Sequence, residues 1–353
     1  MNKSSTMMAA VCYGPGDLRL EERPLPVLQE PADAIVKVTL STICTSDLHI
    51  LHGAVPRAIP GTVLGHEFVG QVVETGPGVQ TLSPGDRVAA NCITFCGQCW
   101  FCRHGYINNC QRGGWELGCR IDGCQAEYVR VPFADQGLTL IPSSLTDENA
   151  LFVGDILSSG YFGAQLCQIQ PGDTVAVLGA GPVGLCAMQC ARLFGAAQIV
   201  AVDIDDSRLA IAQQQKLCDR CVNPLTEDAV SIVESLTHGR GADGVIEAAG
   251  GENTLELAWR MARPNAVVAV VAMYEQDQVL PLPRMYGKNL IFKTGGVDAT
   301  HCERLLNLLA CGRLNTDFLI SHRTPLNGIL SAYEAFSQRE SGSLKWAITP
   351  YER

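Results

Sequence analysis

The chain has 353 residues, which is too long for one ordinary hydrophobic core and predicts two domains. Hydrophobic residues make up 47% of it and charged residues 18%, a balance typical of a globular protein with sizeable cores. The net charge of −10 predicts an acidic surface, which disfavours nucleic acid and anionic membranes as partners.

The expected cellular compartment decides whether the many cysteines are disulfides or free thiols. Residues 1–10 lack the long apolar run of a secretory signal, and no stretch approaches the roughly 18 apolar residues of a spanning helix. We therefore expect a cytoplasmic protein without a membrane partner. In that setting the 16 cysteines are expected to be thiols or metal ligands rather than disulfides.

The N-terminal part of the chain, up to about residue 160, contains short β-branched runs broken by glycine and proline. Runs at 34–40, 67–74 and 86–90 predict strands of an all-β, barrel-like unit. Within this unit, Cys44-Thr45-Ser46-Asp47-Leu48-His49 precedes Gly65-His66-Glu67. A thiolate, an imidazole and carboxylates can together hold a catalytic zinc with one open position, although any one of them alone is more often structural.

A second group of cysteines follows at regular spacing. Cys96, Cys99 and Cys102 are each separated by two residues, and Cys110 comes soon after. Four thiolates at this spacing can close a tetrahedron around zinc, which predicts a structural site that orders a loop with little apolar content. A set of free thiols and an iron–sulfur cluster are the alternatives, and the nearby Cys92 could compete as a ligand.

The pattern changes near residue 170 to alternating strands and helices. We expect strands at 174–178, 198–202, 244–247, 266–271 and 290–293, and helices at 182–194, 205–216, 301–310 and 326–337. The alternation predicts an α/β fold with a doubly wound parallel sheet. A last strand at 346–349 could return to the first domain, so we expect domains at 1–160, completed by 300–353, and at 161–299.

A glycine-rich turn links the first of these strands to its helix. Its sequence is Gly179-Ala180-Gly181-Pro182-Val183-Gly184, which fits G-x-G-x-x-G in the strand-to-helix context that a dinucleotide site requires. Gly179 allows the tight turn, Gly181 the approach of the pyrophosphate, and Gly184 close helix–strand packing. The helix that Pro182 and Val183 open offers free N–H groups to the phosphates. A turn without a ligand is the alternative.

The acidic residue after the strand expected at 198–202 indicates which dinucleotide is bound. The Asp203 carboxylate is placed to accept hydrogen bonds from the adenosine ribose hydroxyls, and it would repel a 2′-phosphate. The sequence therefore predicts NAD rather than NADP. Arg208 could pair with such a phosphate, but we expect it to flank the adenine.

With these motifs the chain resembles, essentially from end to end, the medium-chain zinc-dependent alcohol dehydrogenases. The resemblance implies a GroES-like catalytic domain beside a Rossmann domain, and it implies Cys44 and His66 as zinc ligands with Glu67 close to the metal. The segment around Asp155 resembles the tetrameric bacterial secondary alcohol dehydrogenases, which implies Asp155 as the third ligand. Those relatives lack the four-cysteine loop and favour NADP, whereas this chain has the loop and Asp203.

The resemblance also implies the chemistry. Zinc would bind the oxygen of an alcohol and favour the alkoxide, and a hydride would pass to NAD. Ser46 and His49 would relay the proton to solvent, and Asp47 would orient His66. The alternatives to a relay are that the Ser46 hydroxyl only hydrogen-bonds the backbone and that His49 is a surface residue.

The expected substrate is a small to medium, secondary alcohol or ketone. Alternatives are a polyol, diol or amino-alcohol dehydrogenase on the same scaffold, a zinc-free quinone reductase, and a non-catalytic zinc-stabilised NAD-binding sensor. The intact Cys44, His66 and Asp155 set with Ser46 argues against the last two. The resemblance further implies a homo-oligomer, a homotetramer in preference to a dimer, in which 287–297 could pair across a two-fold axis.

Overall fold

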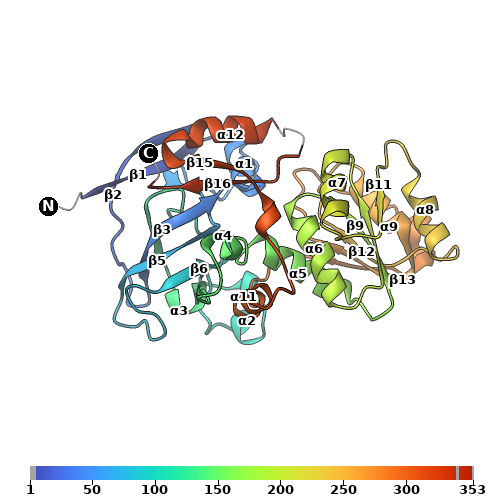
Figure 1. Cartoon of the computed structure of the whole chain (residues 1–353), viewed down its shortest axis with the longest axis horizontal. Coiled ribbons are helices and arrows are strands. Elements are labelled where there is room, and N and C mark those ends of the chain that lie inside the picture. Colours follow the sequence, from blue (N-terminus) through green and yellow to red (C-terminus); the bar gives the residue numbers. More distant parts are fainter. Residues whose placement is uncertain (1–4, 339–341, 352–353) are drawn as a thin grey trace. The chain divides into compact units, whose positions relative to one another are not determined.

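The computed structural model describes residues 5–338 and 342–351, which form two compact units (Figure 1). The first unit comprises Met1–Asp155 and Asp298–Arg353, and the second comprises Ile156–Val297. The sequence placed these junctions after residues 160 and 299. The structure starts the second unit earlier because helix α5 (Ile156–Cys167) packs against helix α6 (Pro182–Leu193) of that unit.

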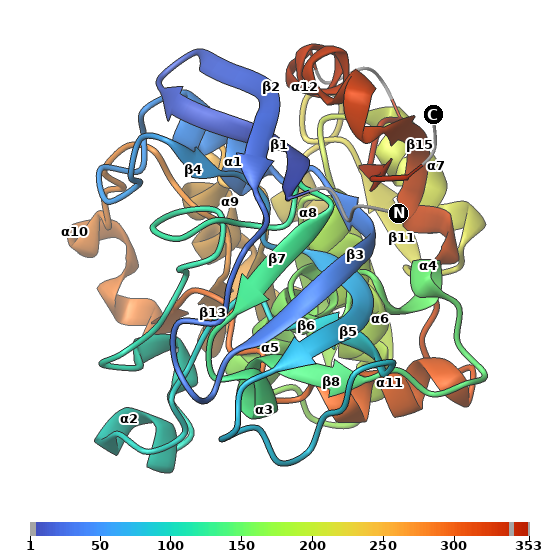
Figure 2. The same ribbon diagram turned by 90° about the vertical axis from the view of Figure 1, so that its left-hand side faces the viewer.

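The first unit is built mainly from strands, which form two sheets. The three-stranded sheet has the order β2-β1-β4, and the larger sheet has the order β15-β16-β3-β5-β6-β8, with β7 also paired to β3 (Figure 2). The strands are β1 (Thr6–Gly14), β2 (Asp17–Pro24), β3 (Ala34–Thr42), β4 (Thr62–Val63), β5 (Phe68–Thr75), β6 (Arg87–Ala90), β7 (Tyr128–Val131), β8 (Leu138–Leu140), β15 (Ile320–Pro325) and β16 (Lys345–Thr349). Strand β3 is rich in β-branched residues, and its Val36 and Val38 are buried beside Phe68 of β5.

The C-terminal strand completes the larger sheet of the first unit. Strand β16 pairs antiparallel with β3, with Ala347 opposite Thr42, so residues far apart in sequence lie side by side. The helices of this unit are α1 (Thr45–Leu51), α2 (Trp100–Arg103), α3 (Ala134–Gly137), α4 (Asp147–Ala150), α11 (Cys302–Ala310) and α12 (Ile329–Ser337), with short 3-10 turns at Ile107–Asn109, Asp317–Leu319 and Leu326–Gly328. The pairing of β16 with β3 places Lys345 in the interior of the unit.

The second unit is a parallel six-stranded sheet with helices on both faces. Its strand order, β11-β10-β9-β12-β13-β14, is that of a Rossmann fold. The strands are β9 (Thr174–Leu178), β10 (Gln198–Val202), β11 (Arg220–Val222), β12 (Ala242–Glu247), β13 (Ala262–Val270) and β14 (Ile291–Thr294); the further helices are α7 (Asp206–Gln214), α8 (Ala229–Leu236), α9 (Thr254–Met261) and α10 (Leu282–Met285), with a 3-10 turn at Tyr286–Lys288. Helices α6 and α7 cover one face, and α8 and α9 the other (Figure 1).

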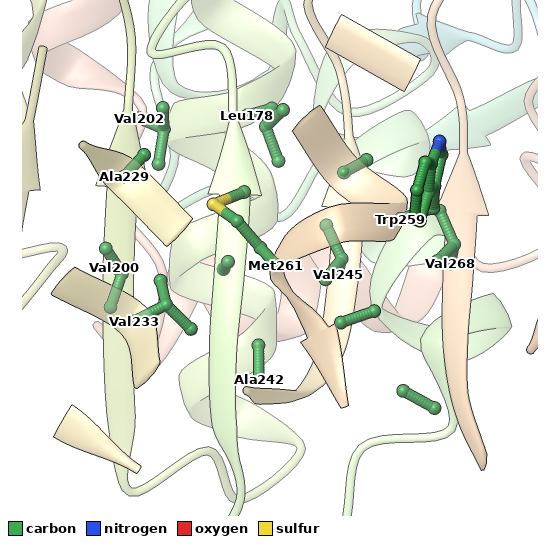
Figure 3. Close-up of a cluster of buried hydrophobic side chains, with 14 of the residues drawn as sticks. Leu178, Val200, Val202, Ala229, Val233, Ala242, Val245, Trp259, Met261 and Val268 are labelled. Carbon is green, nitrogen blue, oxygen red and sulfur yellow. The ribbon is translucent and has the colours of Figure 1, made fainter. Parts of the chain in front are cut away.

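The core under α8 and α9 fixes this sheet. Val200 and Val202 of β10 lie beside Val233 of α8, and Val268 of β13 lies beside Trp259 of α9; all five side chains are buried (Figure 3). Burying one aliphatic side chain of this size contributes roughly 1.5–3 kcal/mol. The carboxyl edge of the sheet, where the glycine-rich turn lies, is therefore supported by a rigid core. Within the described residues, no helix is both long and apolar enough to cross a membrane.

Candidate metal centres and dinucleotide turn

Four predicted side chains converge in the first unit. Ligand atoms of Cys44, His66, Glu67 and Asp155 all lie within 4.8 Å of one another. Cys44 immediately precedes α1, His66 and Glu67 precede β5, and Asp155 ends the segment before α5. Three separate segments thus bring sulfur, nitrogen and oxygen donors to one point.

The beginning of α1 fixes the thiol. The Cys44 backbone N–H donates to Asp47 Oδ2 at 2.9 Å, which closes a capping box at the start of the helix. Ser46 Oγ lies 3.7 Å from Cys44 Sγ. Ser46 and the half-buried His49 are three residues apart on α1, so they share one face of the helix.

The Asp155 carboxylate lies between the other donors. Its Oδ2 is 3.1 Å from His66 Nε2 and 3.8 Å from Cys44 Sγ. Its Oδ1 accepts a hydrogen bond from the Cys92 thiol at 3.6 Å. Cys92 therefore contacts a member of the cluster but is not one of its four converging groups.

A buried chain of polar side chains holds the other nitrogen of His66. His66 Nδ1 lies 3.3 Å from Asp47 Oδ1, while Asp47 Oδ2 accepts from Gln125 Nε2 at 3.2 Å. Gln125 Oε1 in turn accepts a hydrogen bond from Tyr333 Oη of α12 at 2.8 Å. All four side chains are at most 4% exposed. This arrangement directs Nε2 of His66 toward the cluster.

Electrostatics at this cluster favour a cation. Burial alone would lower the pKa of His66, but the Asp47 charge and a hydrogen bond to Asp155 raise it well above its usual range. Burial alone would raise the pKa of Asp155, but its hydrogen bond to His66 lowers it. Three buried carboxylates surround one imidazole here, a distribution that binding a divalent cation would stabilise.

Lys345 of β16 makes a buried ion pair with Glu67 Oε2, and it also donates to the Ile43 carbonyl. Burial raises the pKa of Glu67 to about 7, although the Lys345 charge opposes this shift. The second oxygen of Glu67 is buried without a hydrogen-bond partner. A buried acceptor left this way is costly, and an ion among these donors would satisfy it. Sulfur, nitrogen and carboxylate donors of this kind fit a catalytic zinc site.

The four cysteines of the local loop form a second cluster. Cys96, Cys99, Cys102 and Cys110 also place their Sγ atoms within 4.8 Å of one another. Cys99 immediately precedes α2, and Cys110 follows the 3-10 turn Ile107–Asn109.

Backbone groups prepare the sulfurs of this four-cysteine loop for a metal. N–H groups of Cys96 and Arg112 donate to Cys110 Sγ at 3.3 and 3.4 Å. Hydrogen bonds from the backbone of Cys102 and Gln111 lower the pKa of Cys99 to about 6. Burial and Cys99 raise the pKa of Cys102 to about 12, so a cation is needed to ionise the whole set. Four thiolates leave no open position, which fits a structural zinc.

In the second unit, the glycine-rich turn has the geometry that its sequence predicts. Gly179 has φ +94°, and a Cβ at Gly184 would lie 1.7 Å from the Gly179 carbonyl oxygen. A Cβ at Gly181 would meet only Arg208 Nη1, at 3.6 Å, so the turn leaves space beside Gly181. Pro182 and Val183 open α6 directly after it. The helix N-terminus and this space fit the phosphates of a dinucleotide.

The acidic residue after β10 is joined to this turn. Asp203 Oδ2 accepts from the Ala180 N–H at 2.6 Å, and Oδ1 accepts from the Asp205 N–H at 2.9 Å. Arg208 Nε lies 3.7 Å from Asp205 Oδ2. A carboxylate has further acceptor capacity beyond these two bonds, which remains available for a ribose.

Three residues around the cluster, Lys345, Gln125 and Tyr333, were not predicted from the sequence. Each is an ordinary polar residue outside any motif, and only the fold brings it to the cluster. An isolated lysine within the apolar strand β16 was the one available signal, because lysine is rarely buried without a partner.

These two units together define a zinc-dependent oxidoreductase of the dinucleotide-linked type. The alcohol dehydrogenase GroES-like domain family matches residues 30–143, and the zinc-binding dehydrogenase family matches residues 182–308. An alcohol dehydrogenase of Cupriavidus necator is 38% identical over 99% of this chain and 100% of its own length. A solved structure of an alcohol dehydrogenase from Thermus sp. ATN1 is 41% identical in sequence. The match covers 97% of this chain and 99% of that chain, with a TM-score of 0.90. The NADP-dependent isopropanol dehydrogenase of Thermoanaerobacter brockii is 34% identical over 86% of this chain and 87% of its own.

The chain belongs to the medium-chain zinc-dependent alcohol dehydrogenase family. It is an alcohol dehydrogenase-type oxidoreductase, and its GroES-like and Rossmann-type units are those of that family. Its two clusters fit the zinc that the family binds.

Proposed function

We propose that this enzyme interconverts small to medium secondary alcohols and ketones with NAD(H). The observation that carries the proposal is the convergence of Cys44, His66, Glu67 and Asp155. With Glu67 held in its ion pair with Lys345, the other three would bind the metal and the fourth position would be left for substrate. A relative named for isopropanol, a secondary alcohol, supports the substrate class. Zinc at these three residues would supply a Lewis acid that lowers the pKa of an alcohol or polarises a carbonyl.

The chain's own residues do the remaining work around the metal. Asp47, held by the Cys44 N–H and Gln125, keeps the His66 ring oriented so that Nε2 faces the site. Lys345 holds Glu67 by one oxygen, which leaves the other next to the ligands. The site is buried, so a proton released by the substrate needs a path of side chains to water.

Ser46 and His49 are the proposed path. Ser46 Oγ is close to the cluster through its contact with Cys44, and His49 lies one helical turn further along α1. Ser46 would accept the proton of the alcohol, and His49 would pass it to solvent. For Ser46→Ala we expect kcat to fall by about 10²-fold or more with both zinc sites occupied. Ser46→Thr, which keeps the hydroxyl, is the matched control, and unchanged turnover in Ser46→Ala would remove Ser46 from the path.

Asp203 supports NAD as the cofactor. Its bonds to Ala180 and Asp205 fix a negative charge next to the turn, where a 2′-phosphate would be repelled. The name of the Thermoanaerobacter brockii relative shows that the family also uses NADP, so this choice depends on Asp203. For Asp203→Ser we expect the ratio of kcat/KM for NAD over NADP to fall by at least about tenfold. An unchanged ratio would contradict the assignment.

The proposed assembly is a homo-oligomer, a tetramer in preference to a dimer. Strand β14 lies at one end of the six-stranded sheet, and its Ile291 is exposed, as is the nearby Tyr286. Unpaired strand edges with apolar side chains are suited to pairing with a second copy. Light scattering tests this, and a monomeric mass would reject it.

The substrate proposal is tested with a panel of alcohols. Zinc-loaded enzyme and NAD are incubated with propan-2-ol, butan-2-ol, primary alcohols, diols and polyols, and NADH is followed by absorbance. We expect the highest kcat/KM for the simple secondary alcohols. A higher kcat/KM for a diol, polyol or amino alcohol would overturn the proposed substrate class and leave the metal chemistry in place.

A further inference from the structure

Two cysteines of the second unit lie close enough to react with each other. Cys218 precedes β11 and Cys221 lies within it, and their Sγ atoms are 3.4 Å apart. A disulfide bond is about 2.05 Å long, so forming it would draw the two residues closer together. Both residues are partly exposed, so a small oxidant has access to them.

The surroundings favour redox chemistry over metal binding at this pair. A structural zinc usually has four ligands. In the described part of the chain, three or more candidate ligands gather only at the two clusters of the first unit. Cys218 and Cys221 therefore have too few partners to hold zinc, whereas two thiols are all that a disulfide needs.

The pair also differs from the motif of thiol oxidoreductases. In those enzymes the C-x-x-C sequence lies at a helix N-terminus, which lowers the pKa of the attacking thiol. Here Cys221 lies in a strand, and burial together with Cys221 raises the pKa of Cys218 to about 12. The pair is therefore suited to slow, reversible modification and not to rapid turnover.

We propose that Cys218 and Cys221 form a reversible disulfide with an oxidised low-molecular-weight disulfide such as glutathione disulfide, and that this bond weakens dinucleotide binding. The Cys221 thiolate attacks one sulfur of glutathione disulfide and releases one glutathione. Cys218 then attacks the Cys221 sulfur of the mixed disulfide and releases the second. Two protein thiols are oxidised, one glutathione disulfide is reduced, and the two thiol protons end on glutathione.

The disulfide would weaken cofactor binding because residues of β11 contact Asp203 and α7. This step rests on the proposed NAD function. The carbonyl of Val222 accepts the backbone N–H of Asp203 at 3.2 Å. The Cys221 thiol donates to the Leu209 carbonyl of α7 at 3.4 Å. Oxidation removes this donor and pulls Cys221 toward Cys218, so it disturbs both the strand that holds Asp203 and the helix that follows.

The residue after Val222 also holds the segment that follows Asp203. Asn223, next to Val222, donates from Nδ2 to the Ile204 carbonyl at 3.2 Å and to Asp206 Oδ1 at 2.8 Å. The three consecutive residues 221–223 thus hold the segment that runs from Asp203 into α7. A shift of Cys221 is therefore transmitted to the proposed ribose-binding carboxylate through short backbone and side-chain contacts.

Peptide mapping of the zinc-loaded protein tests the disulfide. Trypsin cleaves after Lys216 and Arg220, so a Cys218–Cys221 bond would keep peptide 217–220 attached to peptide 221–240. After treatment with glutathione disulfide we expect this linked species, and we expect dithiothreitol to separate it. Cys218→Ser should instead yield a glutathione adduct on Cys221, and Cys311→Ser, which removes an exposed cysteine elsewhere, should still yield the link. Separate, fully alkylated peptides would overturn the proposal.

Titration with NADH tests the coupling on the same samples. We expect the Kd of the oxidised protein to rise by about fivefold or more, the lower end of usual allosteric effects, and to recover on reduction. Cys221→Ser, which removes the attacking thiol and keeps a donor facing Leu209, should show no such rise. A linked peptide with an unchanged Kd would overturn the coupling alone. A reduced protein that fails to bind NADH would overturn the proposed cofactor, while the linked peptides still report on the disulfide.

Discussion

The two metal clusters of the first unit differ in how they are assembled. All four donors of the four-cysteine loop come from residues 96–110, and backbone N–H groups of the same cysteines donate hydrogen bonds to the sulfurs. The other cluster takes Cys44, His66 and Asp155 from three separate segments. One cluster is therefore local in sequence, whereas the other exists only after the unit has folded.

Their surroundings differ in the same way. The loop has a small apolar cluster, in which Phe95 and Ile107 pack beside two of the cysteines, so metal ligation must supply much of its order. The assembled cluster, which is the proposed catalytic cluster, has Tyr333, Gln125 and Lys345 around it. All three are buried, and all come from distant parts of the chain. Metal ligation therefore stabilises the four-cysteine loop, whereas the fold stabilises the assembled cluster. Each of the following variants tests one side of that contrast.

The largest expected effect is on the loop. Cys110→Ser removes one thiolate from the closed set, and zinc binding is worth about 10–16 kcal/mol in small peptides that fold around the metal. We expect loss of one zinc equivalent, proteolytic cleavage within 96–110, and a lower Tm. Zinc analysis and limited proteolysis measure this, with Cys311→Ser as the control. Retention of both zinc equivalents would show that the loop does not depend on four thiolates.

Asp155→Asn tests the cluster that the fold assembles. The amide keeps the volume of the side chain but gives up the charge that contacts His66, so the metal should be lost from this site alone. Removing residues outside the ligand set of a metal typically costs 10–100-fold, so we expect kcat/KM to fall by more than about 10²-fold. The four-cysteine loop should keep its zinc, and the Tm should change little. Glu303→Gln, an exposed acidic residue, is the control. Equal loss from both clusters would contradict their independence.

Lys345→Met tests the buried ion pair. Removing one partner of such a pair leaves the Glu67 charge uncompensated, which costs about 3–5 kcal/mol of unfolding free energy. Urea denaturation measures this loss. The double variant Lys345→Met with Glu67→Gln removes both charges and should recover much of the stability. A double variant no more stable than Lys345→Met would mean that packing of Lys345, and not its charge, is what matters.

The smallest expected effect concerns the polar chain behind His66. Gln125→Leu removes the donor to Asp47, and we expect zinc affinity at the catalytic cluster to fall by roughly tenfold. Tyr333→Phe, one step further out, should lower it less. Competition with a chelator measures both affinities, and the affinity of the four-cysteine loop serves as the internal reference. A larger effect for Tyr333→Phe than for Gln125→Leu would contradict the order of contacts.

Much of the fold could be predicted because its signals are local. The buried runs at 174–178 and 198–202 coincide with β9 and β10, since continuous apolar runs are what parallel strands require. Element ends were less accurate: β13 begins at Ala262, several residues before the predicted start, because the polar residues there carry no strand pattern. The final strand does return to the first unit, where β16 pairs with β3.

Part of the site could be predicted for the same reason. Cys96, Cys99 and Cys102 are spaced so that one short loop can present all of them to a metal. The structure brings these residues together. Asp155 came from a resemblance and not from spacing. Lys345 and Gln125 had no local signal, because their importance depends on pairings between distant segments that only tertiary structure creates.

We propose that zinc at the assembled cluster drives NAD-linked oxidation of a secondary alcohol. The direct test is to strip the metal from the catalytic cluster with a chelator and follow NADH formation from propan-2-ol before and after zinc is returned, with NADP compared in parallel. We expect activity to disappear with one zinc equivalent, to return when zinc is restored, and to be higher with NAD than with NADP. Turnover that persists after the catalytic zinc is removed would contradict it.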